Sequence, residues 1–562
     1  MSDVVSLDSA TYRRLYGPTT GDVIRLGDSG LAIQVEHDDV AYGDEVLGGC
    51  GKTWRDGFYV RKRPGDSELD LLVSNVVLID PVLGIRKTCI GIKDGRVVGI
   101  GRAGSPDVID GVDLVVGPHT ALVPGEGMIA TPGAVDSHVH LASPALLDVA
   151  LSAGITTMVG MGIGGVWDVG VNPKYNIHAL TEAFRDVPMN ILFLARGSTT
   201  DRGAMEAALA AGAGGFKVHE DYGASPACID ACLDVAEAAD VGVALHSDSL
   251  NEFGLLADTV EAMRGRTVHA YHVEGGGGHP DLLEILEHPH VLGSSTTPTV
   301  PYGIHTLDEL FPMTMTVHRQ SHLLESDVET TMSRLHQAGI QAENLLHHLG
   351  AISIINSDAL GMGRIGEMLR RTWQLAANTA LHTANPFSGN GPAHNELVLQ
   401  FLAKVTVNAA LAHGIADHVG SLRPGRLADI VLWDPAWFGA KPELVLKSGF
   451  VAWGAAGQGN GSTRSCEPRV LGPYFGAMGG APRRLAATFV TADALDGDEL
   501  VEGPRYLPVR GARGLTRADM VRNAAVPSVR VPTDGSPVEV DGAPVRVAPL
   551  DHVPFGQGAY LA

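Results

Sequence analysis

The chain has 562 residues, of which 45% are hydrophobic and 19% are charged. This is the composition of a globular protein, and the length exceeds one ordinary hydrophobic core, so two or three domains are expected. Asp and Glu (64) outnumber Lys and Arg (41), and the formal charge of −23 argues against nucleic acid or an anionic membrane surface as a partner.

Membrane insertion and export are not expected from the sequence. No apolar stretch reaches the ~18 residues that span a bilayer. The first residues carry neither the basic region nor the apolar core of a signal peptide. Five cysteines are too few for a disulfide scaffold, and Cys228 and Cys232, one helical turn apart, are interpreted as helix-packing residues. We therefore expect a cytoplasmic protein.

Residues 1–131 are predicted to form the first part of a β-rich domain. The run 71–80 is strand-like, and 91–100 has the pattern of a hairpin around an Asp-Gly turn, with no clear helix pattern nearby. After residue 420 strand patterns return, so 421–480 is predicted to complete the same β-rich domain. Residues 481–562 form a mixed C-terminal segment.

Residues 132–420 alternate short β-branched runs with helical stretches, of which 204–211 and 226–239 are the clearest. Eight strands separated by helices predict a (β/α)8 barrel. The candidate strands are 134–140, 155–160, 189–195, 215–219, 241–246, 267–272, 291–295 and 352–358.

Metal-capable side chains stand at the carboxyl ends of these strands, where barrel active sites are built. The residues are His138 and His140, Lys217 and His219, His246, His272, and Asp358. Any one of them taken singly would ordinarily be a satisfied core or surface residue. Their gathering on one rim favours a site for two borderline divalent ions such as nickel or zinc.

Lys217 has a distinct chemical expectation. A buried ammonium beside two cations is repelled, so its pKa should fall. The neutral amine can then add carbon dioxide to form a carbamate, an anionic oxygen donor long enough to bridge two metals. The alternative is a lysine whose amine reaches solvent, which is common.

Several segments together resemble the urease α-subunit family, within the metal-dependent amidohydrolase superfamily. The resemblance runs nearly end to end, and its strongest segments are 17–22 (GPTTGD), 132–140 (PGAVDSHVH), 217–223 (KVHEDYG), 244–252 (ALHSDSLNE), 350–358 (GAISIINSD) and 362–364 (MGR). The first His-x-His motif alone marks only the superfamily, whereas the later segments are specific to ureases.

The resemblance implies nickel-dependent hydrolysis of urea to ammonia and carbamate. One nickel ion would be held by His246 and His272, the other by His138, His140 and Asp358, with carbamylated Lys217 and a hydroxide bridging them. His219 would bind the substrate carbonyl, His318 on a mobile flap would protonate the leaving ammonia, Asp221 would orient His318, and Arg334 would complete the network. Related α subunits assemble with β and γ chains into a trimer of heterotrimers and are loaded by nickel-delivering accessory proteins.

The sequence departs from this family around the substrate. Val317 stands where a cysteine is usual and Arg319 where a second histidine is usual, while Tyr222 replaces a tryptophan. The loop 161–170, with its Trp-Asp pair, does not align, and 275–279 is short. Three alternatives therefore stay open: the same chemistry on a substituted urea or small amide, a dizinc enzyme of the hydantoinase or dihydroorotase kind, and a non-catalytic assembly subunit.

Overall fold

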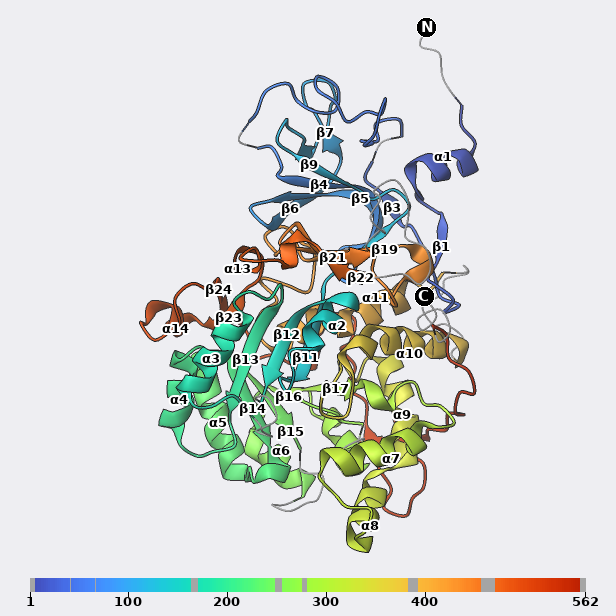
Figure 1. The fold of residues 1–562 in the computed structure, drawn as a ribbon. Helices are drawn as coiled ribbons and strands as arrows, with labels where there is room; N and C mark the ends of the chain where they lie inside the picture. The colour runs from blue at the N-terminus through green and yellow to red at the C-terminus, as the bar shows by residue number, and fades with distance from the viewer. Residues whose placement is uncertain are drawn as a thin grey trace.

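The computed structural model describes residues 6–40, 42–65, 67–162, 170–247, 255–274, 280–382, 393–455 and 471–555. A β-rich part lies at one end of the molecule, a barrel occupies the centre, and α7 (Thr306–Val317) and α8 (Glu325–Arg334) lie at the opposite end in the view of Figure 1. Across the described ranges, no helix is both long and apolar enough to cross a membrane.

The barrel consists of eight strands in chain order, each parallel to the next. They are β11 (Ala134–His140), β12 (Ile155–Met161), β13 (Asn190–Arg196), β14 (Gly215–His219), β15 (Gly242–His246), β16 (Val268–Ala270), β17 (Val291–Thr296) and β18 (Ile354–Asn356). The predicted (β/α)8 fold is confirmed, with strand bounds shifted by at most a few residues. The strands are almost continuously buried, as expected for a parallel sheet covered by helices.

Contacts between the first and last strands bring the ring nearly to closure. The backbone N–H of Ala359 donates to the carbonyl of His138 at 3.3 Å, and that of His140 donates to the carbonyl of Ala359 at 3.0 Å. Behind this seam, Ser357 donates its hydroxyl to Asp136 at 2.5 Å. The end of the chain's eighth strand is thereby placed beside the end of its first.

Helices cover the outside of the barrel (Figure 1). α5 (Pro226–Ala239) shows why they form where they do, because Pro226 at its first turn is preorganised for a helix and Asp240 ends it with a left-handed φ of +52°. Its Cys228 and Cys232 are buried, as interpreted from the sequence. The other helices here are α2 (Leu146–Ser152), α3 (Lys174–Phe184), α4 (Arg202–Ala210), α6 (Leu256–Met263), α9 (Gln337–Leu349), α10 (Met368–His382), α11 (Asn395–Lys404) and α12 (Val407–Ala412).

The β-rich part is one sheet built from both sides of the barrel sequence. Its strands are β3 (His37–Asp38), β4 (Leu71–Asp80), β5 (Gly84–Lys93), β6 (Arg96–Gly101), β9 (Ala121–Pro124), β10 (Ile129–Pro132), β19 (Ile430–Trp433), β20 (Leu444–Lys447), β21 (Phe450–Ala455) and β22 (Leu471–Pro473). β10 pairs with β4 on one side and with β19 on the other, which confirms a composite β-rich domain. The hairpin also turns as predicted, with positive φ at Asp94 and Gly95. The domain limits themselves stay a prediction.

A buried ion pair joins this sheet to the barrel. Nζ of Lys447 donates to Oδ2 of Asp429 at 2.5 Å and to the carbonyl of Thr156 on β12 at 3.1 Å. The amide of Asn190, on β13, donates to the same carboxylate oxygen at 2.7 Å. Both charged side chains are almost fully buried, so hydrogen bonds of a desolvated ion pair join the β-rich sheet to the barrel.

Two features differ from the sequence expectation or add to it. The expectation of no helix near the N-terminus is wrong, because α1 (Ser9–Tyr16) forms there, capped by Asp8, which accepts from the N–H of Thr11 at 2.8 Å. The C-terminal segment packs on the barrel, where β23 (Thr488–Thr491) pairs with β13 and β24 (Tyr506–Val509). The remaining elements are β1 (Val23–Arg25), β2 (Ala32–Gln34), β7 (Ala103–Gly104), β8 (Leu114–Val115), α13 (Pro482–Leu485), α14 (Ala492–Asp496), β25 (Val529–Arg530), β26 (Glu539–Val540) and β27 (Ala543–Pro544).

Candidate metal centre

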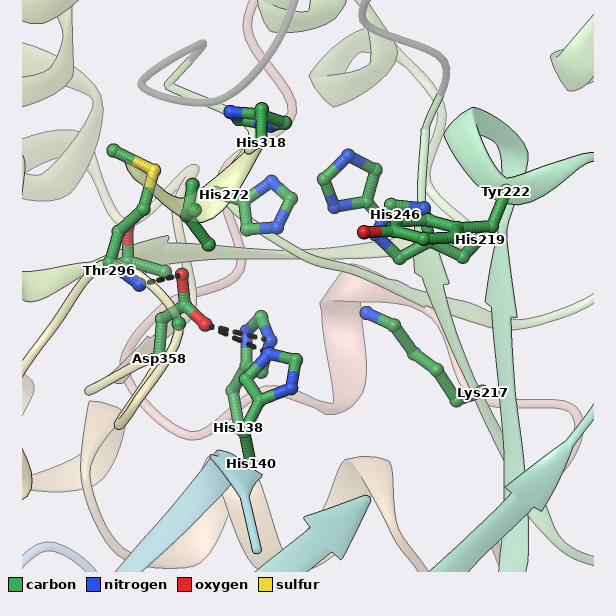
Figure 2. Close-up of a pocket in the computed structure, with 13 residues that line it drawn as sticks. His138, His140, Lys217, His219, Tyr222, His246, His272, Thr296, His318 and Asp358 are labelled. Carbon is green, nitrogen blue, oxygen red and sulfur yellow. Dashed lines mark hydrogen bonds and ion pairs between the residues drawn. The ribbon is translucent and has the colours of Figure 1, made fainter. Parts of the chain in front are cut away.

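One cavity at the carboxyl ends of the strands collects most of the residues that the sequence singled out (Figure 2). We call it the central cavity. Its lining is His138, His140, Lys217, His219, Tyr222, His246, His272, Thr296, Val317, His318, Asp358, Gly361 and Met362. All six predicted metal ligands are therefore on its wall, together with the predicted substrate-binding and flap histidines.

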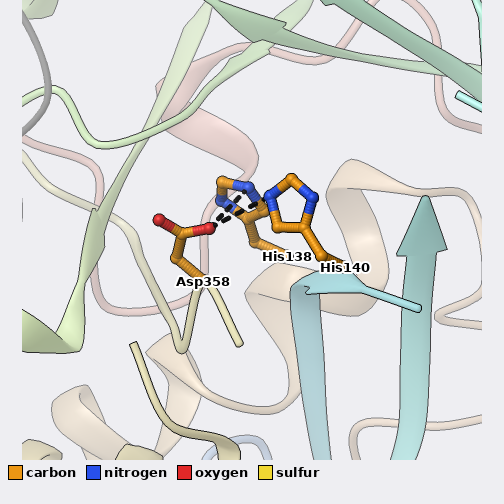
Figure 3. Close-up of side chains that lie close together, drawn as sticks. All are labelled: His138, His140 and Asp358. Atoms are coloured by element: carbon orange, nitrogen blue, oxygen red, sulfur yellow. Dashed lines mark ion pairs between the residues drawn. The ribbon is translucent and has the colours of Figure 1, made fainter. Parts of the chain in front are cut away.

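The first and last strands supply one group of potential ligands (Figure 3). Nε2 of His138 and Nε2 of His140 each lie 3.2 Å from Oδ1 of Asp358. One ligand atom from each residue falls within 4.8 Å of the others, which is close enough for a shared cation. The alternation of a strand turns both histidines to the same side, and the seam of the barrel brings the carboxylate to them.

The opposite wall supplies a second group. His246 lies 3.3 Å from Oδ2 of Asp221 through its Nε2, and its ring stacks on His219 with centroids 3.7 Å apart. Ligand atoms of His219, Asp221 and His246 fall within 4.8 Å of one another. His272 lies between the two groups, with its ring centroid 4.3 Å from that of His246 and 5.5 Å from that of His138.

Lys217 points into the same space from β14 (Figure 2). Its side chain is buried, and Nζ lies 3.8 Å from the ring centroid of Tyr271, which also stacks on His138. Among the residues that the structure describes, Nζ has no hydrogen-bond acceptor. Burial lowers the pKa of this amine well below its usual value, which the carboxylates of Asp358 and Asp221 only partly oppose.

The donor set fits divalent cations. Within the described ranges, Nδ1 of His138, Nδ1 of His219 and Nζ of Lys217 are buried without a hydrogen-bond partner. Buried polar atoms are normally paired, so their concentration around one cavity indicates a group that would complete them. Burial also lowers the pKa of His138 and of His272 well below the usual value, which keeps these rings in the neutral form that binds metals.

The backbone at two predicted ligands is strained. His272 has a φ of +33° and Asp358 a φ of +50°, in the left-handed region that residues with a side chain seldom adopt. Such strain persists where the surroundings fix it, and it gathers at functional sites. At Asp358 the fixing contact is visible, because the N–H of Met362 donates to Oδ2 of the carboxylate at 3.2 Å and leaves Oδ1 to face the histidines.

The residues predicted for the flap lie beside this cavity. His318 follows α7, and its Nδ1 lies 2.8 Å from the carbonyl of Thr314. Since a carbonyl only accepts, Nδ1 carries the proton, and Nε2 is the ring nitrogen left for a ligand. Burial and then the charge of Arg334 lower the pKa of His318 to about 4. Arg334 lies 3.7 Å from Oδ2 of Asp221, behind the cavity wall.

The structure thus places all ten predicted site residues in one neighbourhood. Tyr222 lies against His219, with ring centroids 4.6 Å apart, whereas 163–169 and 275–279 lie outside the described residues. Sequence reasoning gave no role in the site to Thr296 or Met362. Thr296 ends β17, so the rule that selected the other strand-end residues would have found it, whereas Met362 entered only as part of the segment 362–364 that carries the resemblance.

Comparison with known proteins agrees with this geometry. Residues 129–472 match the amidohydrolase family, and residues 5–123 match the N-terminal domain of the urease alpha subunit. The chain is 48% identical over 562 residues to urease subunit alpha 2 of Streptomyces coelicolor, which covers 99% of this chain and 100% of that protein. The chain belongs to the urease α-subunit family.

Other urease α subunits support the assignment over nearly the whole length. Urease subunit alpha 1 of Streptomyces avermitilis is 48% identical over 555 residues, covering 98% of this chain and 99% of that protein. Urease subunit alpha of Natronomonas pharaonis is 44% identical over 567 residues, covering 99% and 100%. The chain is accordingly an enzyme, a hydrolase of the amidohydrolase family that acts on C–N bonds.

Proposed function

We propose that this chain is the catalytic subunit of a urease, which hydrolyses urea to ammonia and carbamate with two nickel ions. The observation that carries the proposal is the convergence of six metal-capable side chains from five strands on one buried cavity. The family assignment supports urea as the substrate, and the flap histidine with the full-length match favours nickel over zinc.

Two sets of side chains would hold the ions. His138, His140 and Asp358 form the first set, and His246 and His272 the second, with a carbamate on Lys217 between them. When bound, such a pair of cations polarises the urea carbonyl and lowers the pKa of a water enough to give hydroxide at neutral pH. The buried amine of Lys217, without an acceptor among the described residues, suits the addition of carbon dioxide.

The size of the central cavity fits a very small substrate. Only about 40 Å³ of it is open to the centre of a water-sized sphere. Urea has four non-hydrogen atoms, whereas a hydantoin ring with a side chain is far larger. Val317 and Met362 on the cavity wall have apolar side chains, so they offer few hydrogen bonds to a polar substituent on a urea nitrogen.

The remaining polar residues would act on the substrate. His219, whose Nδ1 has no partner in the described ranges, would donate to the carbonyl oxygen of urea. Nε2 of His318, which is unprotonated while the pKa lies at about 4, would take up the proton that the attacking water releases and pass it to the leaving nitrogen, with Nδ1–H held by Thr314. Asp221 and Arg334 lie behind these groups, where Asp221 would orient His318 and Arg334 would complete the network.

Assembly and location follow from the family alone. We expect separate β and γ subunits in a trimer of heterotrimers, accessory proteins that load nickel, and a cytoplasmic setting. The excess of acidic residues keeps nucleic acid and anionic membranes improbable partners.

The proposal is tested by metal analysis together with ammonia release. Nickel-loaded and zinc-loaded protein, assembled with its β and γ subunits, is assayed on urea, N-methylurea and hydantoin, with Asp358→Asn as the control for the site. We expect about two nickel ions per chain and turnover of urea above the other substrates. Preference for N-methylurea would indicate the substituted-urea alternative, turnover of hydantoin by the zinc form a hydantoinase, and far fewer than two ions a non-catalytic subunit.

A further inference from the structure

Two buried carboxylates stand two positions from predicted metal ligands, yet neither is on the wall of the central cavity. Asp136 precedes His138 by two residues on β11, and Glu274 follows His272 by two residues after β16. A carboxylate that is taken out of water needs hydrogen-bond donors, because an unpaired buried charge is costly. For both side chains, a hydroxyl on a neighbouring strand end is such a donor, so each carboxylate joins a ligand-bearing segment to the next strand.

Asp136 joins the first barrel strand to the last. Its Oδ1 accepts hydrogen bonds from the N–H of His138 at 3.3 Å and from the N–H of Ser357 at 3.1 Å. Its Oδ2 accepts a hydrogen bond from the hydroxyl of Ser357 at 2.5 Å, and this hydroxyl in turn accepts one from the N–H of Ala359 at 2.9 Å. Because Asp358 lies between Ser357 and Ala359, the network fixes the backbone on both sides of this ligand and at His138.

Glu274 joins the segment after β16 to the end of β17. Its Oε1 accepts a hydrogen bond from the hydroxyl of Thr296 at 2.9 Å and a longer one from the N–H of Thr296 at 3.4 Å. Between His272 and Glu274, the N–H of Val273 donates to the carbonyl of Ser294 at 3.0 Å. His272 itself has a φ of +33°, and a strained backbone of this kind persists only where its surroundings hold it. Glu274 supplies such a hold on the side of His272 that leads away from the strand.

We propose that Asp136 and Glu274 are positioning residues, each of which sets the backbone of one group of metal ligands. The ligands concerned are His138, His140 and Asp358 in the first group and His272 in the second. A bound cation holds its ligand atoms to within about 0.2 Å of preferred distances, so a backbone that is already fixed needs less rearrangement on binding. That these side chains bind metal rests on the proposed function, whereas the two hydrogen-bond networks do not. The networks share no residue, so each can be disturbed separately.

The test removes the hydroxyl partners, because substitution of the carboxylates would also change the electrostatic attraction for a cation. Ser357→Ala and Thr296→Val each delete one hydrogen-bond donor without changing any charge. The occupancy of each metal position at limiting free nickel is measured by anomalous diffraction at the nickel absorption edge. Ser357→Ala should weaken binding at the first position and Thr296→Val at the second, by roughly 10–100-fold in affinity. The ratio of the two occupancies should therefore shift in opposite directions in the two variants.

Thr372→Val is the matched control. The hydroxyl of Thr372 is also buried, but it donates within α10 to the carbonyl of Met368 at 2.8 Å, so its loss should leave the ratio of occupancies unchanged. If Ser357→Ala and Thr296→Val both shift the ratio in one direction, the two roles are overturned. A ratio that neither variant changes would overturn them as well.

A second measurement uses the metal-free protein. Amide hydrogen exchange followed by mass spectrometry should become severalfold faster at 136–141 and 357–360 in Ser357→Ala, and at 271–274 and 294–297 in Thr296→Val. A general loss of stability would instead raise exchange across the whole barrel, and that result would overturn the positioning roles. Fewer than two ions in the wild-type chain would contradict the proposed function, and the location of the faster exchange would then decide on the two networks.

Discussion

The buried pair between Lys447 and Asp429 allows a quantitative test of how the β-rich sheet is fastened to the barrel. Lys447→Met removes the ammonium and keeps most of the side-chain volume. Among the described residues, the side chain of Asp429, which is 4% exposed, then keeps two hydrogen-bond donors, the N–H of Ser448 at 2.8 Å and the amide of Asn190 at 2.7 Å. Removing one member of a buried pair costs about 3–5 kcal/mol because the other charge stays desolvated.

The two single substitutions and the double substitution separate charge from packing. Asp429→Asn should also lower the free energy of unfolding. Burial already lowers the pKa of Lys447, so loss of its proton would limit this effect. The double variant Lys447→Met/Asp429→Asn leaves no buried charge without a partner. Its loss of unfolding free energy should therefore be smaller than the sum of the two single losses by more than about 1 kcal/mol.

The assay is unfolding in guanidinium chloride followed by circular dichroism, because urea is the proposed substrate. Arg483→Met is the control, since Arg483 pairs with Asp186 where the side chains are 47% and 52% exposed, and such pairs contribute about 1 kcal/mol or less. If Lys447→Met costs no more than Arg483→Met, or if the double variant costs the full sum, the reasoning is refuted.

Three further predictions concern the site and the core. Gly361→Ala would place a Cβ 2.3 Å from Oδ1 of Asp358, so the metal content measured at equal free nickel should fall, by analogy with losses of roughly 10–100-fold in metal affinity when the support of a ligand is disturbed. Gly472→Ala is the control and should retain the metal, because nothing lies within 4 Å of its Cβ, and equal metal contents in the two variants would contradict the prediction. Burial lowers the pKa of His413 to about 3, so between pH 6.5 and 3 the unfolded chain binds a proton that the folded chain does not, and stability falls as the pH falls. His413→Gln should reduce that slope of unfolding free energy by about 1.4 kcal/mol per pH unit, and an unchanged slope would exclude a neutral buried His413. Because Val317 stands on the cavity wall and the described cysteines lie elsewhere, thiol-blocking reagents should leave ammonia release unchanged, and loss of activity in step with labelling would count against this.

The residues of the site were predictable because their signal is local. Each follows a short apolar run that forms a barrel strand, and in a parallel barrel the carboxyl ends of all strands meet at one rim. His138, His140, Lys217, His219 and His246 could therefore be assigned to one site before their distances were known. The same local rule selected the strands themselves, because β-branched runs and helical stretches alternate over short windows.

The N-terminal helix and the strand pairing of the composite sheet were not predicted from the sequence, for physical reasons. α1 is only eight residues long and has no buried residue, so its pattern covers little more than two turns, and its N-terminus is capped by one side chain, Asp8. The sequence predicted a composite sheet but not its strand order, in which β10 pairs with both β4 and β19, because β10 and β19 lie some three hundred positions apart and no short window of sequence encodes which strands pair.

Sequence patterns suffice to predict the barrel, the composite sheet, the family and the identities of the metal-capable residues, because periodicity and strand-end position are properties of neighbouring residues. Which of those residues face one another depends on the folded chain. The seam between β11 and β18 brings Asp358 to His138 and His140, and the loop after Asp358 sets Met362 on the wall of the central cavity. These contacts depend on ring closure and on packing of side chains from distant segments, so they exist only once the whole barrel has formed.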